Sequence, residues 1–254
     1  MGNPVTVRKL WKWSMHISPD LVFISETMIS KEAVEMKKGR IGFSNAFRVA
    51  SQGKSGGLCL FWNEEVTDFS LVSFSQNHIC GDVNKGEVTW RFVGIYRWLD
   101  SGNKFRTWAL IEHFCRDVDV PIIFGGDFNE LLSHEEKDGG SDRERSEIAK
   151  FREMVDTCEL RGLGFEGQWW TWERGNSIES YVRERLDRYL ASPSWMDLFP
   201  NAYVEHLLRH SSDHTPIVVR TRPRDKQQKR PRKSFKFKTA WLLDTSCEAV
   251  IKEA

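Results

Sequence analysis

The segment from Ile122 to Asn129, Ile-Ile-Phe-Gly-Gly-Asp-Phe-Asn, constrains the fold of this chain more than any other. Its apolar residues Ile122–Phe124 predict a short buried strand, and the two glycines that follow allow a tight turn of the backbone. Asp127 and Asn129 come next, two positions apart, so an extended path would point both side chains to the same side. The segment therefore predicts a carboxylate and an amide at the end of a rigid strand.

Two interpretations of Asp127 and Asn129 remain open at this point. Mg²⁺ prefers oxygen ligands and leaves positions for substrate phosphate, so a carboxylate and an amide at a strand end suit its chemistry. Alternatively, the Asp127 side chain hydrogen-bonds to the backbone of Asn129 in an ordinary strand-end turn. The segment alone favours the turn, whereas polar residues elsewhere in the chain favour the ion.

Two further polar residues end predicted strands. Leu21–Ile24 predicts a buried strand that is followed by Glu26, for which the alternative is a helix-capping acid. Tyr96 ends a strand predicted over residues 88–96, where it is placed to stack or to hydrogen-bond at the mouth of a site. The alternative for Tyr96 is an ordinary aromatic at a packing interface.

The second half of the chain adds two acids and a histidine. Asp187 falls inside a strand predicted over Tyr181–Leu190, where a buried carboxylate needs a partner. Asp213 and His214 lie in a predicted turn before the strand Ile217–Val219. An imidazole beside a carboxylate stays protonated more readily and can stabilise negative charge on a phosphate. The alternative is a turn acid next to a surface histidine.

The remaining periodicity mixes helices with many short strands. Predicted helices span residues 4–16, 31–38, 104–116, 146–160 and 194–199, and further strands span residues 58–62, 66–96 and 202–208. A chain of 254 residues is long enough to bury a full core in one large domain. The mixture predicts an α/β fold of two packed sheets flanked by helices.

Composition bears on location and partners. No apolar run reaches the roughly 18 residues of a membrane span, and the first residues lack the apolar core of a signal peptide. The five cysteines have no paired spacing, which favours reduced thiols inside the cell and disfavours a structural zinc site. We therefore expect an intracellular protein with no membrane segment and no small-molecule cofactor.

Positive charge is concentrated near the C-terminal end. Arg220–Lys233 contains eight Lys and Arg residues and one acid, although the whole chain carries a net charge of +1. The segment is consistent with contact to a polyanion, and equally with a solvated linker. We expect residues 1–220 to form the domain, 221–233 a basic linker, and 234–254 the start of a further region.

Taken together, the polar residues at strand ends resemble the endonuclease/exonuclease/phosphatase superfamily, which has the deoxyribonuclease I-like fold. The resemblance is carried by Ser25-Glu26-Thr27, Gly126-Asp127-Phe128-Asn129, Arg185-Leu186-Asp187-Arg188 and Ser212-Asp213-His214. The segments between them are most similar to the plant branch of LINE-type retrotransposon endonuclease domains. Examples are Gly56-Gly57-Leu58, Asn77-His78-Ile79 and Trp195-Met196-Asp197-Leu198-Phe199-Pro200.

The resemblance implies Mg²⁺-dependent hydrolysis of a DNA phosphodiester in the nucleus, with Mn²⁺ as a substitute ion. It implies that Glu26 binds the metal and that Asp213 contributes to the metal site. It also implies that Asp127 orients or deprotonates the attacking water, while Asn129 helps to hold the phosphate. DNA is the partner that these roles require.

The same resemblance assigns the remaining site residues. His214 would contact the scissile phosphate, Asp187 would position His214, and Tyr96 would lie near the phosphate. These roles agree with general physics, since an ion neutralises the phosphate and a protonated imidazole stabilises developing negative charge.

Departures from the family pattern qualify the expected activity. The family's first strand, which carries Trp-Asn, has no counterpart here, because Met1–Pro4 matches the family sequence that directly follows that strand. We therefore expect the sandwich without that strand, and an activity that is weakened or lost. Arg97 also stands where a glycine is usual, which adds bulk and charge near the cleft. Two alternative functions are a non-catalytic nucleic-acid-binding remnant and a phosphatase of the same superfamily.

Overall fold

The computed structural model describes residues 4–52, 56–65, 67–98, 105–116, 120–177, 179–209 and 212–221. All of them lie in one compact unit, Met1–Arg222, while a second unit comprises Pro223–Ala254. The expected basic linker and the region after it thus fall almost wholly outside the described residues, and the domain boundaries stay predictions. No helix in the described part of the chain is long and apolar enough to cross a membrane.

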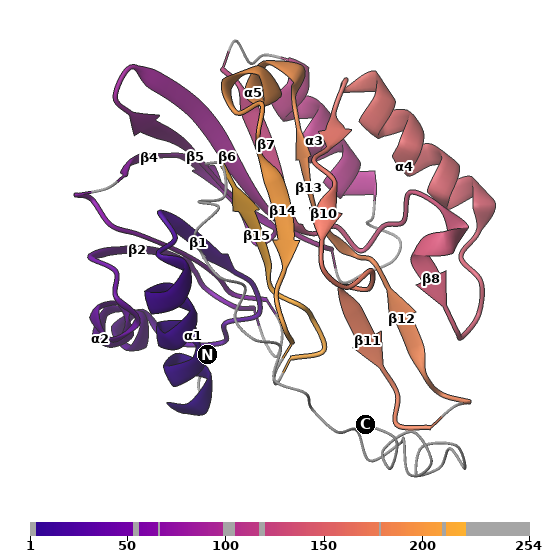
Figure 1. Ribbon diagram of the computed structural model, residues 1–254, viewed down its shortest axis with the longest axis horizontal. Coiled ribbons are helices and arrows are strands. Elements are labelled where there is room, and N and C mark those ends of the chain that lie inside the picture. The colour runs from indigo at the N-terminus through magenta and orange to yellow at the C-terminus, as the bar shows by residue number, and fades with distance from the viewer. Residues whose placement is uncertain are drawn as a thin grey trace, which may run out of the picture. The chain divides into compact units, whose positions relative to one another are not determined.

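A six-stranded sheet forms the centre of the first unit (Figure 1). Its order is β4 (Asp68–Phe74), β5 (His78–Lys85), β6 (Val88–Tyr96), β7 (Ile122–Asp127), β13 (Asp187–Ala191) and β9 (Arg161–Gly162). β6 and β7 pair in parallel, and the other neighbours pair antiparallel. The parallel pair requires a crossover, which contains α3 (Phe105–Arg116).

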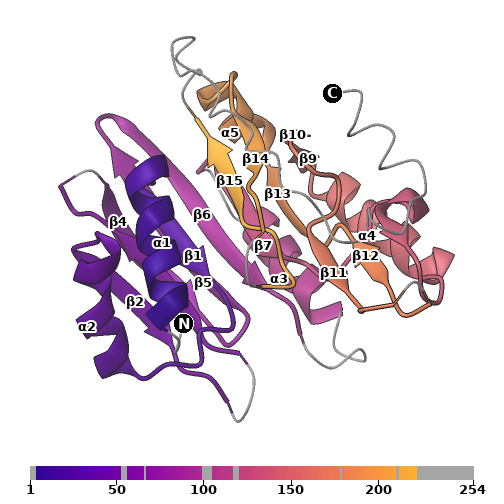
Figure 2. The same cartoon turned by 60° about the horizontal axis from the view of Figure 1, so that its bottom comes forward.

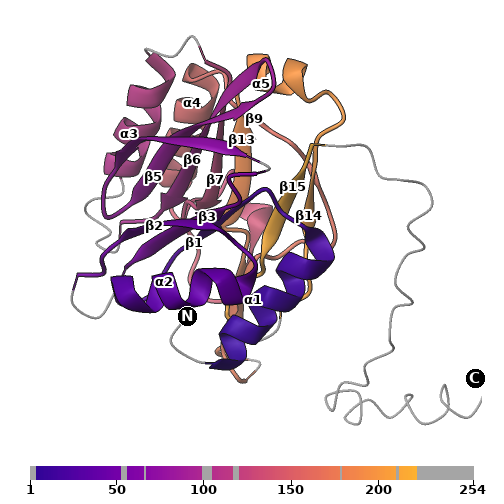
Figure 3. The same ribbon diagram turned by 90° about the vertical axis from the view of Figure 1, so that its left-hand side faces the viewer.

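One face of this sheet is covered by α3 and α4 (Arg145–Thr157), as Figure 3 shows. Both helices present an apolar side to the sheet: Ile111 and Phe114 from α3, and Phe151 and Met154 from α4, belong to one buried cluster with Phe124 of β7. The predicted helical periodicity of these two segments is confirmed because the apolar stripe has a sheet face to cover.

Two three-stranded sheets lie on the other face. One has the order β1 (Leu21–Ile24), β3 (Leu58–Trp62), β2 (Asn45–Val49), and the other has the order β10 (Phe165–Glu166), β14 (Tyr203–His206), β15 (Ile217–Arg220). α1 (Pro4–Ile17) and α2 (Lys31–Ile41) cover the outer side of the first (Figure 2). Within the described residues, β1 and β15 each pair with one neighbour only, so both are edge strands.

A last small sheet corrects one expectation. It contains β11 (Trp172–Arg174), β12 (Val182–Glu184) and β8 (Lys137–Asp138), and a 3₁₀ turn at His134–Glu136 precedes it. The single strand predicted over Tyr181–Leu190 is wrong, because β12 and β13 belong to different sheets.

Between β12 and β13 the chain passes from the small sheet to the six-stranded sheet, and the side chain of Thr171 binds the backbone at this junction. The backbone amides of Leu186 and Asp187 both donate to Thr171 Oγ1, at 2.9 Å each. These bonds replace ladder hydrogen bonds at the junction and fix the first residue of β13. The local sequence pattern could not predict these hydrogen bonds, because Thr171 is 15 residues before Leu186. The helix α5 (Pro193–Leu198) follows, close to its expected position.

Candidate active site

Three of the predicted site residues lie side by side across the central sheet. The register pairs Tyr96 with Asp127 between β6 and β7, and Asp127 with Asp187 between β7 and β13. Residues in register on neighbouring strands point to the same face, about 5 Å apart. All three are buried, with 2%, 4% and 8% of their surfaces exposed in that order. We call Tyr96, Asp127 and Asp187 the strand-end row.

Gly126 allows the strands of this row to lie close together. Its φ of +137° belongs to a region that favours glycine, and a Cβ atom there would lie 2.1 Å from the carbonyl oxygen of Ile95. Any side chain at this position would push β7 away from β6, and the distance between Tyr96 and Asp127 would grow. The second glycine of the opening sequence motif is therefore required by packing.

Glu26 joins the row through Tyr96. The Tyr96 hydroxyl donates to Glu26 Oε1 at 2.8 Å. Burial, followed by the hydrogen bond to Glu26, raises the pKa of Tyr96 well above its ordinary value, so the phenol remains a neutral donor at physiological pH. Glu26 is an exposed residue just after β1 whose φ is +53°. The structure thus brings an exposed acid from the end of a strand in another sheet to the end of the row.

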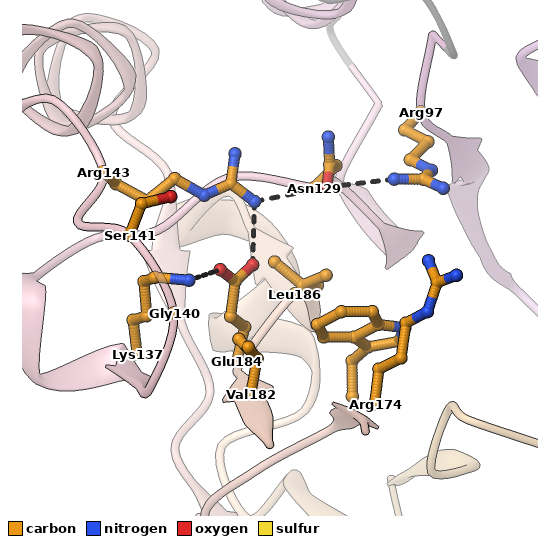
Figure 4. Close-up of a pocket in the computed structure, with 11 residues that line it drawn as sticks. Arg97, Asn129, Lys137, Gly140, Ser141, Arg143, Arg174, Val182, Glu184 and Leu186 are labelled. Carbon is orange, nitrogen blue, oxygen red and sulfur yellow. Dashed lines mark hydrogen bonds and ion pairs between the residues drawn. The ribbon is translucent and has the colours of Figure 1, made fainter. Parts of the chain in front are cut away.

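Asn129 lies beside Asp127 through a turn. β7 ends at Asp127, and Asn129 has a φ of +53°, so the extended path does not continue through both residues. The Asn129 backbone amide instead donates to Asp127 Oδ1 at 2.9 Å, which is the geometry of the alternative interpretation. The turn fixes Asp127 and leaves the Asn129 side chain free to accept from Arg97 and Arg143 (Figure 4).

His214 binds the other end of the row. Its Nδ1 lies 2.9 Å from Asp187 Oδ2, so Asp187 has the partner that its burial requires. Burial lowers the pKa of His214, but the charges of Asp187, Asp127 and Asp213 and the hydrogen bond to Asp187 outweigh it and raise the pKa to about 9. The imidazole is therefore protonated at neutral pH.

Asp127 has a perturbed acidity because it lies in the middle of the row. Burial and the nearby Asp187 carboxylate raise its pKa, and the opposing effects of His214, Arg97 and the Asn129 amide do not cancel this rise. A buried acid between a second acid and a cation is a common signature of a functional site.

Asp213 takes a different position. It is exposed, and its Oδ2 accepts a hydrogen bond from Trp172 Nε1 at 3.1 Å. Among the described residues, no group of three or more His, Cys, Asp or Glu side chains is arranged to hold a metal ion. The structure therefore does not gather Glu26 and Asp213 into one acidic cluster, and their metal-binding roles stay predictions.

The donor set nevertheless fits one type of metal site. Mg²⁺ usually keeps several waters and binds through one or two carboxylates together with substrate phosphates, without a closed protein cage. Glu26 is exposed, and only its Oε1 accepts from Tyr96 in the described structure. One carboxylate with free coordination space beside a buried row suits a water-rich ion of this kind.

Asn77 is a positioning residue that the sequence did not reveal as functional. It is buried, and its Nδ2 donates to the carbonyl oxygens of Tyr96 at 3.1 Å and Arg97 at 2.8 Å. Its own carbonyl accepts from the Tyr96 amide. These three bonds fix the end of β6, and hence Tyr96 and Arg97. An asparagine in a turn gives no sequence signal of this role, because its partners are 19 and 20 residues away.

Known proteins share features of this sequence and fold. A model of the Endonuclease/Exonuclease/phosphatase family matches residues 2–214. No curated protein matches the chain. Among solved structures, the endonuclease domain of TRAS1, a telomere-specific non-LTR retrotransposon, has a TM-score of 0.63 at 16% identity. That alignment covers 87% of this chain and 94% of the TRAS1 chain.

Two further solved structures are similar to a comparable extent. The AP endonuclease LMAP from Leishmania major has a TM-score of 0.63 at 13% identity, covering 84% of this chain and 81% of that chain. The 3′ phosphatase NExo from Neisseria, bound to a product DNA hairpin, has a TM-score of 0.57 at 17% identity, covering 85% and 94%. At such identities the likeness shows the fold alone, and the predicted α/β class is confirmed.

Proposed function

Because this chain belongs to the Endonuclease/Exonuclease/phosphatase family, we propose that it hydrolyses phosphodiester bonds in DNA with Mg²⁺ as its ion. One observation carries the proposal: Asp127 is buried between Tyr96 and Asp187, and Asp187 in turn binds the protonated His214. Attack of water on a phosphate requires a base, a positive charge at a fixed position and a carboxylate that can bind an ion. Asp127, His214 and Glu26 would supply them in that order.

Asp127 acts as the base in this proposal. Its raised pKa lies closer to neutral pH than that of an ordinary carboxylate. Asp127 therefore accepts a proton from water more readily than an ordinary carboxylate does. Its Oδ1 is held by the Asn129 amide, and its position is fixed by strands on both sides. We assign Asn129 to holding the phosphate, since its backbone amide bonds this oxygen and its side-chain amide can donate to a phosphate.

His214 provides positive charge at a fixed position. A protonated imidazole facing a phosphate stabilises the negative charge that develops as water attacks. Asp187 keeps His214 protonated and oriented through the 2.9 Å contact, while Asp187 itself stays buried. The pair therefore acts as a unit, with His214 at the substrate and Asp187 as its positioning residue.

The ion would be held by Glu26, with a contribution from Asp213. When bound, Mg²⁺ neutralises phosphate charge and polarises the bond that breaks, and Mn²⁺, which also takes oxygen ligands, would substitute for it. Tyr96 orients Glu26 from within the row, so that a neutral hydroxyl rather than a cation fixes the carboxylate. This leaves the negative charge of Glu26 for the ion.

Origin and location are part of the same proposal. Similarity in fold to the TRAS1 endonuclease domain supports descent from a LINE-type retrotransposon. Solved relatives in complex with DNA, including NExo with a product hairpin and D. rerio TDP2 with a single-strand product, support DNA as the partner. A DNA substrate would place the protein in the nucleus.

Nicking of supercoiled plasmid tests this function. The chain is incubated with Mg²⁺ or with EDTA, alongside Asp127→Asn, which preserves the shape of the side chain. Asp68→Asn is the matched control, because Asp68 is an exposed acid at the start of β4 on the edge of the sheet. We expect Mg²⁺-dependent nicking that Asp127→Asn abolishes and Asp68→Asn leaves unchanged.

Other outcomes identify the alternatives. Hydrolysis of phosphomonoesters without nicking would favour a phosphatase, the activity for which the 3′ phosphatase NExo is named. DNA binding by a folded chain without any hydrolysis, and unaffected by Asp127→Asn, would favour a non-catalytic remnant.

A further inference from the structure

A pocket with an excess of positive charge lies beside Asn129 (Figure 4). It has a volume of about 370 Å³ and lies between the end of β6, the loop before α4 and the strands β11 and β12. Its charged lining residues are four cations and one acid: Arg97, Lys137, Arg143, Arg174 and Glu184. An open cavity with this imbalance attracts an anion.

Glu184 compensates only part of this charge. It is buried, and it pairs with Lys137 through Oε1 and with Arg143 through Oε2, the latter at 2.7 Å. One carboxylate is thus shared by two cations. The same shared pairing holds Lys137 and Arg143 rigidly at the wall of the pocket, so their remaining charge has a fixed position.

Two arginines converge on a single neutral oxygen. Arg97 donates to Asn129 Oδ1 at 3.2 Å, and Arg143 reaches the same oxygen at 3.5 Å. Arg97 Nε is buried without a hydrogen-bond acceptor, since its distance of 3.7 Å to Asp127 Oδ2 is too long. Guanidinium groups that share one weak acceptor have donors left over for a further, charged one.

Arg174 adds an uncompensated cation. It is exposed on β11, where its backbone pairs with β12, and its guanidinium has no hydrogen-bond or ion-pair partner among the described residues. Figure 4 shows its guanidinium on the same side of the pocket as Arg97, without a dashed line to any neighbour. A planar guanidinium with free donors suits the bidentate binding of phosphate oxygens.

We propose that this pocket binds a second phosphate group of the substrate, next to the one that is cleaved. The inference rests on the proposed function, because the pocket is lined by Asn129, whose backbone amide bonds Asp127, and a strand cleaved at Asp127 would carry its next phosphate into the pocket. Arg97 and Arg174 supply the free donors, while Arg143 and Lys137 supply fixed charge. The ligand is either an internal phosphate of a strand or a terminal phosphate.

Binding in the absence of hydrolysis tests the pocket. Fluorescence anisotropy of a fluorescein-labelled DNA duplex is measured in EDTA, from 50 to 200 mM KCl, for the full chain, Arg97→Gln and Arg174→Gln. Each variant should lower the slope of log affinity against log salt by about 1 and weaken binding about tenfold at intermediate salt. Arg174 is exposed, so its variant keeps the test valid even if Arg97→Gln does not fold.

Arg116→Gln is the matched control. Arg116 ends α3 shortly before β7 begins, at the opposite end of β7 from Asp127, and its exposed side chain pairs only with half-buried Glu112 in the described structure. We expect this variant to keep the affinity and slope of the unmodified chain. Unchanged affinity and slope in Arg97→Gln and Arg174→Gln would overturn the proposal, as would an equal loss in Arg116→Gln.

Dinucleotides separate the two sources of phosphate. Calorimetry compares the thymidine dinucleotide with and without a 5′-phosphate. Tighter binding of the phosphorylated form, lost in Arg174→Gln, identifies a terminal phosphate, whereas equal binding that Arg174→Gln weakens identifies an internal one. Binding that depends on Arg174 in a chain without nicking activity would overturn the proposed function and keep the pocket. Nicking by the unmodified chain, together with unchanged DNA binding by Arg97→Gln and Arg174→Gln, would overturn the proposed pocket and keep the proposed function.

Discussion

Two turns that each carry a histidine flank the strand-end row, and they differ in the partners of the imidazole. His78, after the turn between β4 and β5, is buried and bonded by the hydroxyls of Ser73 and Ser75. His214, in the turn before β15, is bonded by the carboxylate of Asp187. Burial, with a smaller effect of His113, lowers the pKa of His78 to about 4, whereas that of His214 rises to about 9.

The difference shows that one turn fixes the position of site residues, while the other carries a charged side chain. Burial without a carboxylate partner keeps His78 uncharged, and the turn before it supplies Asn77, which fixes Tyr96 at one side of Asp127. A charged partner keeps His214 protonated at the other side. The first turn therefore fixes the site, and in the proposed function the second supplies the positive charge that faces the phosphate.

The largest effect should follow from removing the charged partner. Asp187→Asn keeps the shape of the side chain but leaves His214 without a carboxylate, so its pKa should fall and its tautomer and orientation should no longer be fixed. We expect the nicking rate to fall by about 100- to 1,000-fold at neutral pH. Initial rates of plasmid nicking measure this, and a loss of less than threefold would remove Asp187 from the site.

Breaking the neutral turn should cost stability. Asn77→Ala removes both hydrogen bonds to the Tyr96 and Arg97 carbonyls and leaves buried acceptors unpaired, which should lower the free energy of unfolding by about 2–4 kcal/mol. Asn84→Ala is the control, because Asn84 makes its side-chain bonds at an exposed hairpin and should cost under about 1 kcal/mol. Urea denaturation compares the two, and equal losses would contradict the role of Asn77.

The two histidines should give stability opposite dependences on pH. The folded pKa of His78 lies below its ordinary value of 6.5, so the unfolded chain binds more protons and stability falls as pH drops from about 6.5 towards 4. This shift corresponds to at most about 3 kcal/mol. The folded pKa of His214 lies above 6.5, so its contribution is complete below that pH and is lost as pH rises through about 9.

Substitution of His78 checks this sign. His78→Gln keeps a neutral hydrogen-bonding side chain and removes the titration, so the decline of the unfolding free energy between pH 6.5 and 4 should flatten. Urea denaturation at several pH values measures it. An unchanged decline in the variant would assign the acid sensitivity to other groups.

Asp213→Asn should have the smallest effect. The amide oxygen can still accept from Trp172 Nε1, so the turn keeps its geometry while one negative charge is lost. As a contributor to the ion site, Asp213 should change the Mg²⁺ concentration for half-maximal nicking by about tenfold, with little change of rate at saturating Mg²⁺. An unchanged Mg²⁺ requirement would remove Asp213 from the ion site.

The sequence predicted individual helices and strands better than the contacts between them. Apolar runs such as Leu58–Trp62 and helical spacing over residues 105–116 depend on neighbours in the chain, and both elements are present. The alignment of Tyr96, Asp127 and Asp187 depends on pairing between strands far apart in sequence, and was inferred only from a family resemblance. The positions of Tyr96 and Asp127 at strand ends were visible, but that of Asp187 was not, and neither was the register that joins the three.

The errors have the same cause. The expected strand over Tyr181–Leu190 ends early because Thr171 captures two backbone amides at its centre. Asn77 gave no signal because its carbonyl partners lie on the next strand, and the excess charge beside Asn129 comes from four separate elements. Side chains that bond across long sequence separations override local propensity and leave no periodic trace.

The most direct test of this account is to compare nicking rates of His214→Gln and His78→Gln at pH 7.5 with Mg²⁺, normalised to the folded fraction of each chain. The account predicts a loss of at least about 100-fold for His214→Gln, because the charge facing the phosphate is gone, and a loss of under about tenfold for His78→Gln. Similar losses in both variants, or the greater loss in His78→Gln, would contradict the division between a supporting turn and a reacting one.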